Sequence, residues 1–419
     1  CEGDIEWRSI MDHIKFIIED FAIVLSVLMM VYLWIRTSKF HQGNSYKLAD
    51  FLIYFKAFYR KHYYYLLLIP FIFVLNFWYM QLIYIFYLIA IYFLSRPRHE
   101  ITKLVYTGRI WRLGAFMIIF YTVLGTLLML WIPFKHLTSL LAIYVALMPG
   151  LTYLGFALMT PVELLINKGY HLAAKAKLKK HQPLIIGITG SSGKTSVKNY
   201  IYDILKTTRV TFMSPKSYNT LNGISRTINE YLHVNNATLV LEMGATKLGD
   251  IGVDIAIVTQ ITSQHMRSFL SVDNIINEKM KIVEGVRANG FAILNYDCPE
   301  IRSYQLKNPC RVISIGTTPD CDYYASDINM SLDGISFTCV MANEAIEVKT
   351  KLVGRYNINN ILIAIALAKE LQISNNIIKD AIYNFEPVKH RLEIKKDHLI
   401  TTIDDAYNAN PLGFIMALE

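Results

Sequence analysis

Hydrophobic and polar residues are distributed very differently in the two parts of this chain. Long apolar runs dominate the sequence up to Ile166, and each is long enough for a membrane helix, which needs about 20 residues. Beyond His181, short apolar runs alternate with polar segments in which hydrophobic residues recur at helical spacing. That alternation is typical of a soluble α/β domain. The pattern therefore predicts an α-helical membrane region followed by an α/β domain with a mostly parallel sheet.

Four apolar runs are candidates for membrane spans. They are residues 17–35, 63–94, 113–134 and 137–166, the last leaving the bilayer near Pro161. The second run has no charged residue and is too long for one upright helix, but it has the length of a two-span hairpin. Length alone also allows a single long tilted helix at this place.

The distribution of charge favours the hairpin. Residues 36–62 carry six lysines and arginines against one acid, and residues 95–112 carry five against one. The positive-inside rule places both basic segments in the cytoplasm, which requires an even number of crossings between them. The count becomes five spans, with the N-terminus outside and everything after Pro161 inside. A single tilted helix would give four spans and leave one basic segment outside.

Composition limits the class of partner. The net charge of +9 arises from 42 lysines and arginines against 33 acids, but the basic residues gather around the apolar runs, so membrane lipid is the expected partner and nucleic acid is not. Residues 167–181 are expected to form a basic helix that either lies on anionic headgroups or is a solvated linker.

The five cysteines show no CxxC spacing, which fits a reducing compartment. The chain starts without Met and stops within a helical pattern, which suggests a segment of a longer polypeptide.

A glycine-rich loop follows the first strand of the predicted α/β domain. The sequence PLIIGITGSSGKTSVKNY predicts a buried strand, a tight turn, and a helix that begins near Lys194. Backbone N–H groups in such a loop and the helix N-terminus bind phosphate. We expect Lys194 to reach the terminal phosphates and Thr195 to bind Mg²⁺. The predicted phosphate-binding residues are Gly190, Ser191, Ser192, Gly193, Lys194, Thr195 and Ser196.

Several chemically reactive side chains follow later predicted elements. Glu242 ends a strand, where a carboxylate of an open α/β sheet faces the ligand crevice. His265 lies in the loop after the next strand, and Lys279 and Lys281 lie on a helix. Each of these side chains also has an ordinary structural role in many proteins, so the residues by themselves leave both interpretations open.

The loop Thr189-Gly190-Ser191-Ser192-Gly193-Lys194-Thr195 resembles the TGxxGKT loop of the Mur ligase family, and the resemblance covers about residues 183–419. It implies ATP and two Mg²⁺ ions, the first bound by Thr195 and Glu242. It implies that His265 binds the second ion together with Lys279, converted by CO₂ to a carbamate. Lys279 is preferred over Lys281 because it satisfies the family spacing Lys-x-x-Ile/Phe. The resemblance further implies nucleotide contacts from Asn295, Asn360, Arg391 and Asp405.

The resemblance also implies a reaction and a domain order. The string YNANP, at residues 407–411, is similar to the family member that adds D-alanyl-D-alanine to a UDP-linked cell-wall tripeptide. An ATP-dependent ligase that joins an amino acid or dipeptide to a cell-wall precursor is expected, with Lys194, Lys279 and His265 in catalytic roles. The expected parts are a membrane region at 1–166, a linker helix at 167–181, an ATP-binding central domain at 182–392, and the truncated start of a Rossmann-like domain at 393–419.

The front of the chain departs from the family. Soluble Mur ligases have a small α/β domain there that binds UDP, and membrane spans stand in its place. The acceptor is therefore either the soluble UDP-linked peptide or a lipid-linked one, and the expected location is the bacterial plasma membrane with the ligase domain in the cytoplasm. Two other interpretations remain open, a ligase for another amino-acid polymer and a nucleotide-driven transporter or scaffold.

Overall fold

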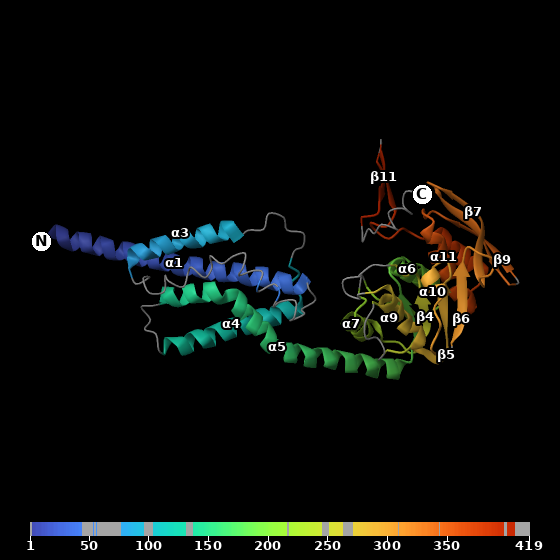
Figure 1. The fold of residues 1–419 in the computed structure, drawn as a ribbon, viewed down its shortest axis with the longest axis horizontal. Coiled ribbons are helices and arrows are strands. Elements are labelled where there is room, and N and C mark those ends of the chain that lie inside the picture. Colours follow the sequence, from blue (N-terminus) through green and yellow to red (C-terminus); the bar gives the residue numbers. More distant parts are fainter. Residues whose placement is uncertain are drawn as a thin grey trace. The chain divides into compact units, whose positions relative to one another are not determined.

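The computed structural model forms two compact units, residues 1–166 and residues 167–419 (Figure 1). It describes residues 2–43, 53, 56, 77–95, 104–130, 137–215, 218–244, 251–262, 271–308, 310–342, 344–397 and 400–406. Each unit is described separately below.

The first unit is helical. Its elements are α1 (Glu2–Gly43), α3 (Trp78–Ser95), α4 (Gly108–Met129) and the first part of α5 (Leu137–His181). Among the described residues, these four helices are long and apolar enough to cross a membrane, with mean hydropathies between 1.6 and 2.2 over their most apolar windows. The predicted first half of the hairpin, at about residues 63–76, lies outside the described residues.

Helix α5 continues from the apolar part of the chain into the second unit. It contains Pro149 and Pro161, yet it runs without a break to His181. The chain was expected to leave the bilayer near Pro161, but the helix does not end at that residue. Within the first unit, Glu163 of α5 accepts two hydrogen bonds from the Arg112 guanidinium of α4, at 2.8 and 3.0 Å, and this paired geometry compensates for the burial of the carboxylate.

The second unit is built on one large sheet. Among the described residues the sheet has nine strands in the order β2-β3-β1-β4-β5-β6-β7-β8-β9, parallel from β2 to β7 and antiparallel from β7 to β9. The predicted mostly parallel α/β fold is confirmed. The elements are β1 (Leu184–Thr189), α6 (Lys194–Leu205), β2 (Thr211–Met213), α7 (Leu221–Tyr231), β3 (Thr238–Glu242), β4 (Val253–Val258), α9 (Val272–Glu284), β5 (Val286–Asn295), α10 (Pro299–Arg302), β6 (Arg311–Gly316), β7 (Tyr323–Ser331), β8 (Gly334–Met341), β9 (Glu344–Thr350), α11 (Tyr356–Glu370) and α12 (Asn375–Tyr383).

Helices cover both faces of this sheet. Ile186 and Ile188 of β1 pack in one cluster with α6, α11 and α12. Ile185, which points to the opposite face, packs in a second cluster with α7, α9 and the end of α5. Burial on both faces explains why the central strands read as continuous apolar runs. The carboxyl ends of β1, β3 and β4 lie together, because these strands are parallel neighbours.

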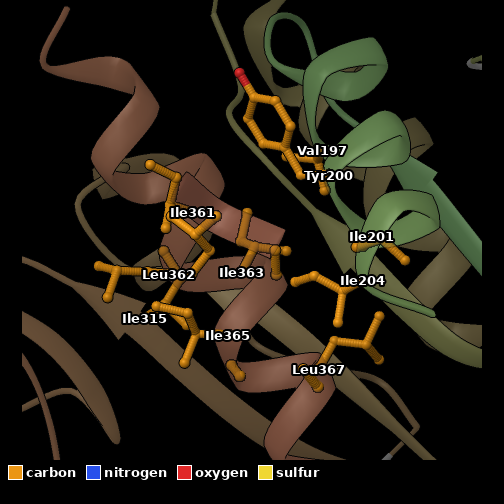
Figure 2. Close-up of a cluster of buried hydrophobic side chains, with 14 of the residues drawn as sticks. Val197, Tyr200, Ile201, Ile204, Ile315, Ile361, Leu362, Ile363, Ile365 and Leu367 are labelled. Carbon is orange, nitrogen blue, oxygen red and sulfur yellow. The ribbon is translucent and has the colours of Figure 1, made fainter. Parts of the chain in front are cut away.

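The contact between α6 and α11 anchors the glycine loop. Figure 2 shows Val197, Tyr200, Ile201 and Ile204 of α6 facing Ile361, Ile363 and Leu367 of α11. The Tyr200 ring also stacks on Phe385, with ring centroids 4.4 Å apart. Since α6 begins directly after the loop, this apolar contact holds the helix N-terminus against the sheet.

Replacing Ile204 by alanine is expected to destabilise the second unit by about 2–5 kcal/mol, because it leaves a cavity in a close-packed contact. Ile204 is 1% exposed. The same change at Ile400, which is 67% exposed, is expected to cost less than about 0.5 kcal/mol. Native-state hydrogen exchange of the α6 and β1 amides measures both effects, and equal protection in the two variants would contradict the assigned core.

The last described segment is a hairpin. Strands β10 (Glu393–Asp397) and β11 (Ile400–Asp404) form a separate antiparallel sheet of two strands. The YNANP string lies outside the described residues. The start of a Rossmann-like domain at residues 393–419 stays a prediction.

Candidate active site

The glycine loop lies between β1 and α6, and two of its glycines have a positive φ. Gly190 has φ +152° and Gly193, which caps α6, has φ +80°. A Cβ atom at Gly190 would lie 2.0 Å from Thr259 Oγ1, and one at Gly193 would lie 2.7 Å from Asn360 Oδ1. Both positions therefore require glycine for conformation and for space.

The serines of the loop hold its backbone against the segment that follows β4. Ser191 N–H donates to the Gln260 carbonyl at 2.6 Å, and Ser191 Oγ accepts from Thr262 N–H at 3.0 Å. The Ser192 hydroxyl donates to Gln260 Oε1 at 2.8 Å. Ser196 is buried in the first turn of α6. These contacts hold the loop against the segment that follows β4.

Two lysines converge on one carbonyl of the loop. Lys194 Nζ donates to the Gly190 carbonyl at 2.7 Å, and Lys279 Nζ, from α9, donates to the same carbonyl at 2.8 Å. Burial, and after it the nearby Lys194 charge, lower the pKa of Lys279 to about 7. Burial also lowers the pKa of Lys194, which the Glu242 carboxylate partly opposes. Lys281, two residues along α9, points into solvent beside Glu278.

A carboxylate and a hydroxyl meet beside the loop. The Thr195 hydroxyl donates to Glu242 Oε2 at 3.0 Å, and Arg391 Nη2 donates to Thr195 Oγ1 at 3.3 Å. Asn219 Nδ2 lies 3.5 Å from Glu242 Oε1. Glu242 is 3% exposed at the end of β3. The structure thus brings together Lys194, Thr195, Glu242, Lys279 and Arg391, which come from distant parts of the sequence.

Asn295, Asn360 and Asp405 have defined partners in the protein. Asn295 Nδ2 donates to the Thr259 carbonyl at 2.8 Å, and its Oδ1 accepts from Asp297 N–H at 3.1 Å. Asn360 is 4% exposed and its amide donates to Asn357 Oδ1, so it lies beneath the loop at Gly193. Asp405 Oδ1 accepts from Leu392 N–H at 3.3 Å, and burial raises its pKa. Nucleotide contacts from these three residues stay predictions.

The predicted metal ligands fit a divalent cation only in part. Thr195 and Glu242 present oxygen atoms beside a phosphate-type loop, which is the donor chemistry that Mg²⁺ prefers. His265 lies outside the described residues. Of the two ligands predicted for the second ion, the structure therefore describes only Lys279.

One buried residue of the site was not singled out from the sequence. Lys198 lies on α6 and its Nζ is 3.7 Å from Glu242 Oε2. The signal was available, because residues three apart on a helix share a face and Lys198 follows Thr195 by three.

The chain is similar to proteins of known families. Residues 188–368 match the Mur ligase middle domain. A UDP-N-acetylmuramoyl-tripeptide--D-alanyl-D-alanine ligase of Buchnera aphidicola is 32% identical over 245 residues, which is 56% of this chain and 53% of that protein. The enzyme of the same name from Bacillus subtilis is 29% identical over 254 residues, covering 59% of this chain and 54% of that protein. The chain spans about half the length of these curated relatives.

Solved structures resemble a large part of this chain. The crystal structure of MurF ligase from Thermotoga maritima in complex with ADP has a TM-score of 0.55 and 23% identity, and the match covers 60% of each chain. A MurF structure from Acinetobacter baumannii has a TM-score of 0.53 and 21% identity, covering 60% of this chain and 56% of that one. At this level of sequence identity, the matches show a similar fold and nothing about activity.

Proposed function

From the Mur ligase middle domain that this chain contains, we propose that it is an ATP-dependent ligase that joins a carboxylate to an amine. The named relatives add D-alanyl-D-alanine to UDP-N-acetylmuramoyl-tripeptide, and we propose D-alanyl-D-alanine or a similar amine here, with a cell-wall peptide as acceptor. The observation that carries this proposal is the meeting of Lys194, Thr195, Glu242 and Arg391 at the glycine loop.

The proposed reaction has two steps. A carboxylate oxygen of the acceptor attacks the γ-phosphorus of ATP, the bond from that phosphorus to the β–γ bridging oxygen breaks, and an acyl phosphate and ADP result. The amine then attacks the acyl carbon, inorganic phosphate leaves, and the amine loses a proton. Charge neutralisation and alignment account for most catalysis of phosphoryl transfer.

The residues of this chain supply that charge. Lys194 would leave the Gly190 carbonyl and bind the terminal phosphates, while the loop N–H groups bind the others. Arg391 reaches Thr195 from the segment before β10, so it would place a second positive charge near the transferred phosphate. Thr195 and Glu242 would hold one Mg²⁺, which neutralises phosphate charge when bound.

Lys279 is proposed to carry a carbamate. The ammonium group first loses a proton. The neutral nitrogen then attacks CO₂, a C–N bond forms as a C=O π bond opens, and a second proton leaves the nitrogen, so that a cation becomes an anion. Only the neutral amine reacts, and burial beside Lys194 lowers the Lys279 pKa to about 7, whereas a lysine in water has a pKa of about 10.4. With His265, the carbamate would bind a second Mg²⁺.

The membrane region is proposed to anchor the ligase. The helices α1, α3, α4 and α5 are long and apolar enough to cross a membrane, which supports a multi-pass membrane protein. Its location in the bacterial plasma membrane, with the ligase unit in the cytoplasm, is part of the proposal. The acceptor would then be either the soluble UDP-linked peptide or a lipid-linked one.

Product analysis with the full-length protein tests the function. We expect ADP release that depends on an added amino acid or dipeptide, and a product heavier than the acceptor by the amine minus water. UDP-linked and lipid-linked acceptors are compared by mass spectrometry in parallel reactions. ATP hydrolysis that is independent of any amine would contradict the ligase and favour a nucleotide-driven transporter.

A further inference from the structure

The buried lysine of α6, Lys198, holds a position that phosphate binding does not explain. Its side chain is 2% exposed, and its Nζ donates to the Ser214 carbonyl at 2.9 Å. The same Nζ lies 3.7 Å from Glu242 Oε2. A buried ammonium group is costly unless it is paired and hydrogen-bonded, so this placement requires the carboxylate and the carbonyl together.

Ser214 connects Lys198 to the strand that carries Glu242. It follows β2 directly and is fully buried. Its Oγ accepts a hydrogen bond from the Glu242 backbone N–H at 3.1 Å, and its own N–H donates to the Val240 carbonyl at 3.0 Å. One residue therefore contacts both the ammonium group of Lys198 and the backbone of Glu242.

We propose that Lys198 is a positioning residue, which fixes the Glu242 carboxylate so that it can bind the divalent cation of the nucleotide. The inference rests on the proposed function. The Thr195 hydroxyl and the Lys198 ammonium group approach the same oxygen, Glu242 Oε2, from two neighbouring turns of α6. Lys198 acts through Glu242 and does not touch the phosphates.

Groups that orient a metal ligand affect metal affinity strongly. Their replacement typically weakens metal binding about 10- to 100-fold. A purely structural tie between α6 and β2 would have a different consequence. If Lys198 were only such a tie, its replacement would shift the whole glycine loop and weaken nucleotide binding equally with and without the metal.

Three variants of the full-length protein separate these roles. Lys198→Gln retains a donor for the Ser214 carbonyl and removes the charge beside Glu242. Lys198→Met keeps an unbranched stem of similar length and serves if the glutamine variant does not fold. Lys177→Gln is the matched control, because Lys177 Nζ ties α5 to the Asn229 carbonyl at 2.6 Å, away from the site.

The measurement is the binding of a fluorescent ATP analogue in EDTA and during titration with Mg²⁺. We expect Lys198→Gln to raise the Mg²⁺ concentration for half-saturation about 10-fold and to leave the affinity in EDTA unchanged. Lys177→Gln should match the wild type in both. An unchanged Mg²⁺ dependence, or an equal loss with and without Mg²⁺, would overturn the positioning role. Failure of the wild type to bind the nucleotide would instead refute the proposed function.

Discussion

Replacing Lys194 by methionine is expected to lower the rate of amine-dependent ADP release about 100- to 1000-fold, the usual effect of removing one group that stabilises transition-state charge. Methionine keeps a similar unbranched stem but has no charge for the phosphates. Lys194 already lies at the Gly190 carbonyl, within the loop that would surround those phosphates. The reaction is followed with saturating ATP and amine, so that the effect is read in the turnover number.

Lys206→Met is the matched control for this prediction. Lys206 caps the far end of the same helix, α6, and forms an exposed ion pair with Asp203. Exposed pairs contribute about 0–1 kcal/mol, so the control should retain the wild-type rate. If Lys194→Met also retained that rate, the assignment of the loop as an ATP-binding site would be wrong.

The parts of the site that the sequence predicted are those with local signals. The glycine loop, the start of α6 at Lys194 and the end of β3 at Glu242 follow from a buried apolar run, a glycine turn and a polar residue after a strand. Parallel strands bring such ends to one edge of a sheet, which is why Thr195 and Glu242 are in contact.

Long-range contacts had no local signal. Arg391 lies 196 positions after Thr195, and only the family resemblance placed it at the nucleotide. The contact of Lys198 with Ser214 depends on the position of β2 beside β3, which the sequence pattern does not specify. Asn360 lies beneath Gly193 and is buried, and its contact with the nucleotide, which only the family resemblance implied, stays a prediction.

Some elements had a signal that was not used. Residues 344–350 alternate between exposed and buried side chains, the period of a strand with one covered face. They pair with β8 as the edge of the sheet. Such alternation predicts an antiparallel extension, whereas the continuous apolar runs of β1 and β4 predict a doubly covered parallel core.

The second large effect is expected at Lys279. In ¹³C-bicarbonate at pH 8, the full-length protein should show a protein-bound carbamate signal by NMR, and Lys279→Ala should lose it. Turnover should fall at least about 10- to 100-fold in that variant, because the carbamate would bind the ion directly and the loss of a mere partner of a metal ligand already has an effect of that size. Lys281→Ala is the control on the same helix, because Lys281 is exposed and lies beside Glu278.

The dependence of this signal on pH follows from the lowered pKa of Lys279, which is about 7. Above pH 7 most of the Lys279 amine is neutral and can attack CO₂, and below pH 7 most of it is protonated and cannot. An ordinary lysine, with a pKa of about 10.4, is almost entirely protonated at both pH 6 and pH 8. The carbamate signal should therefore grow between pH 6 and pH 8. A signal that persists in Lys279→Ala but disappears in Lys281→Ala would move the modified group to Lys281.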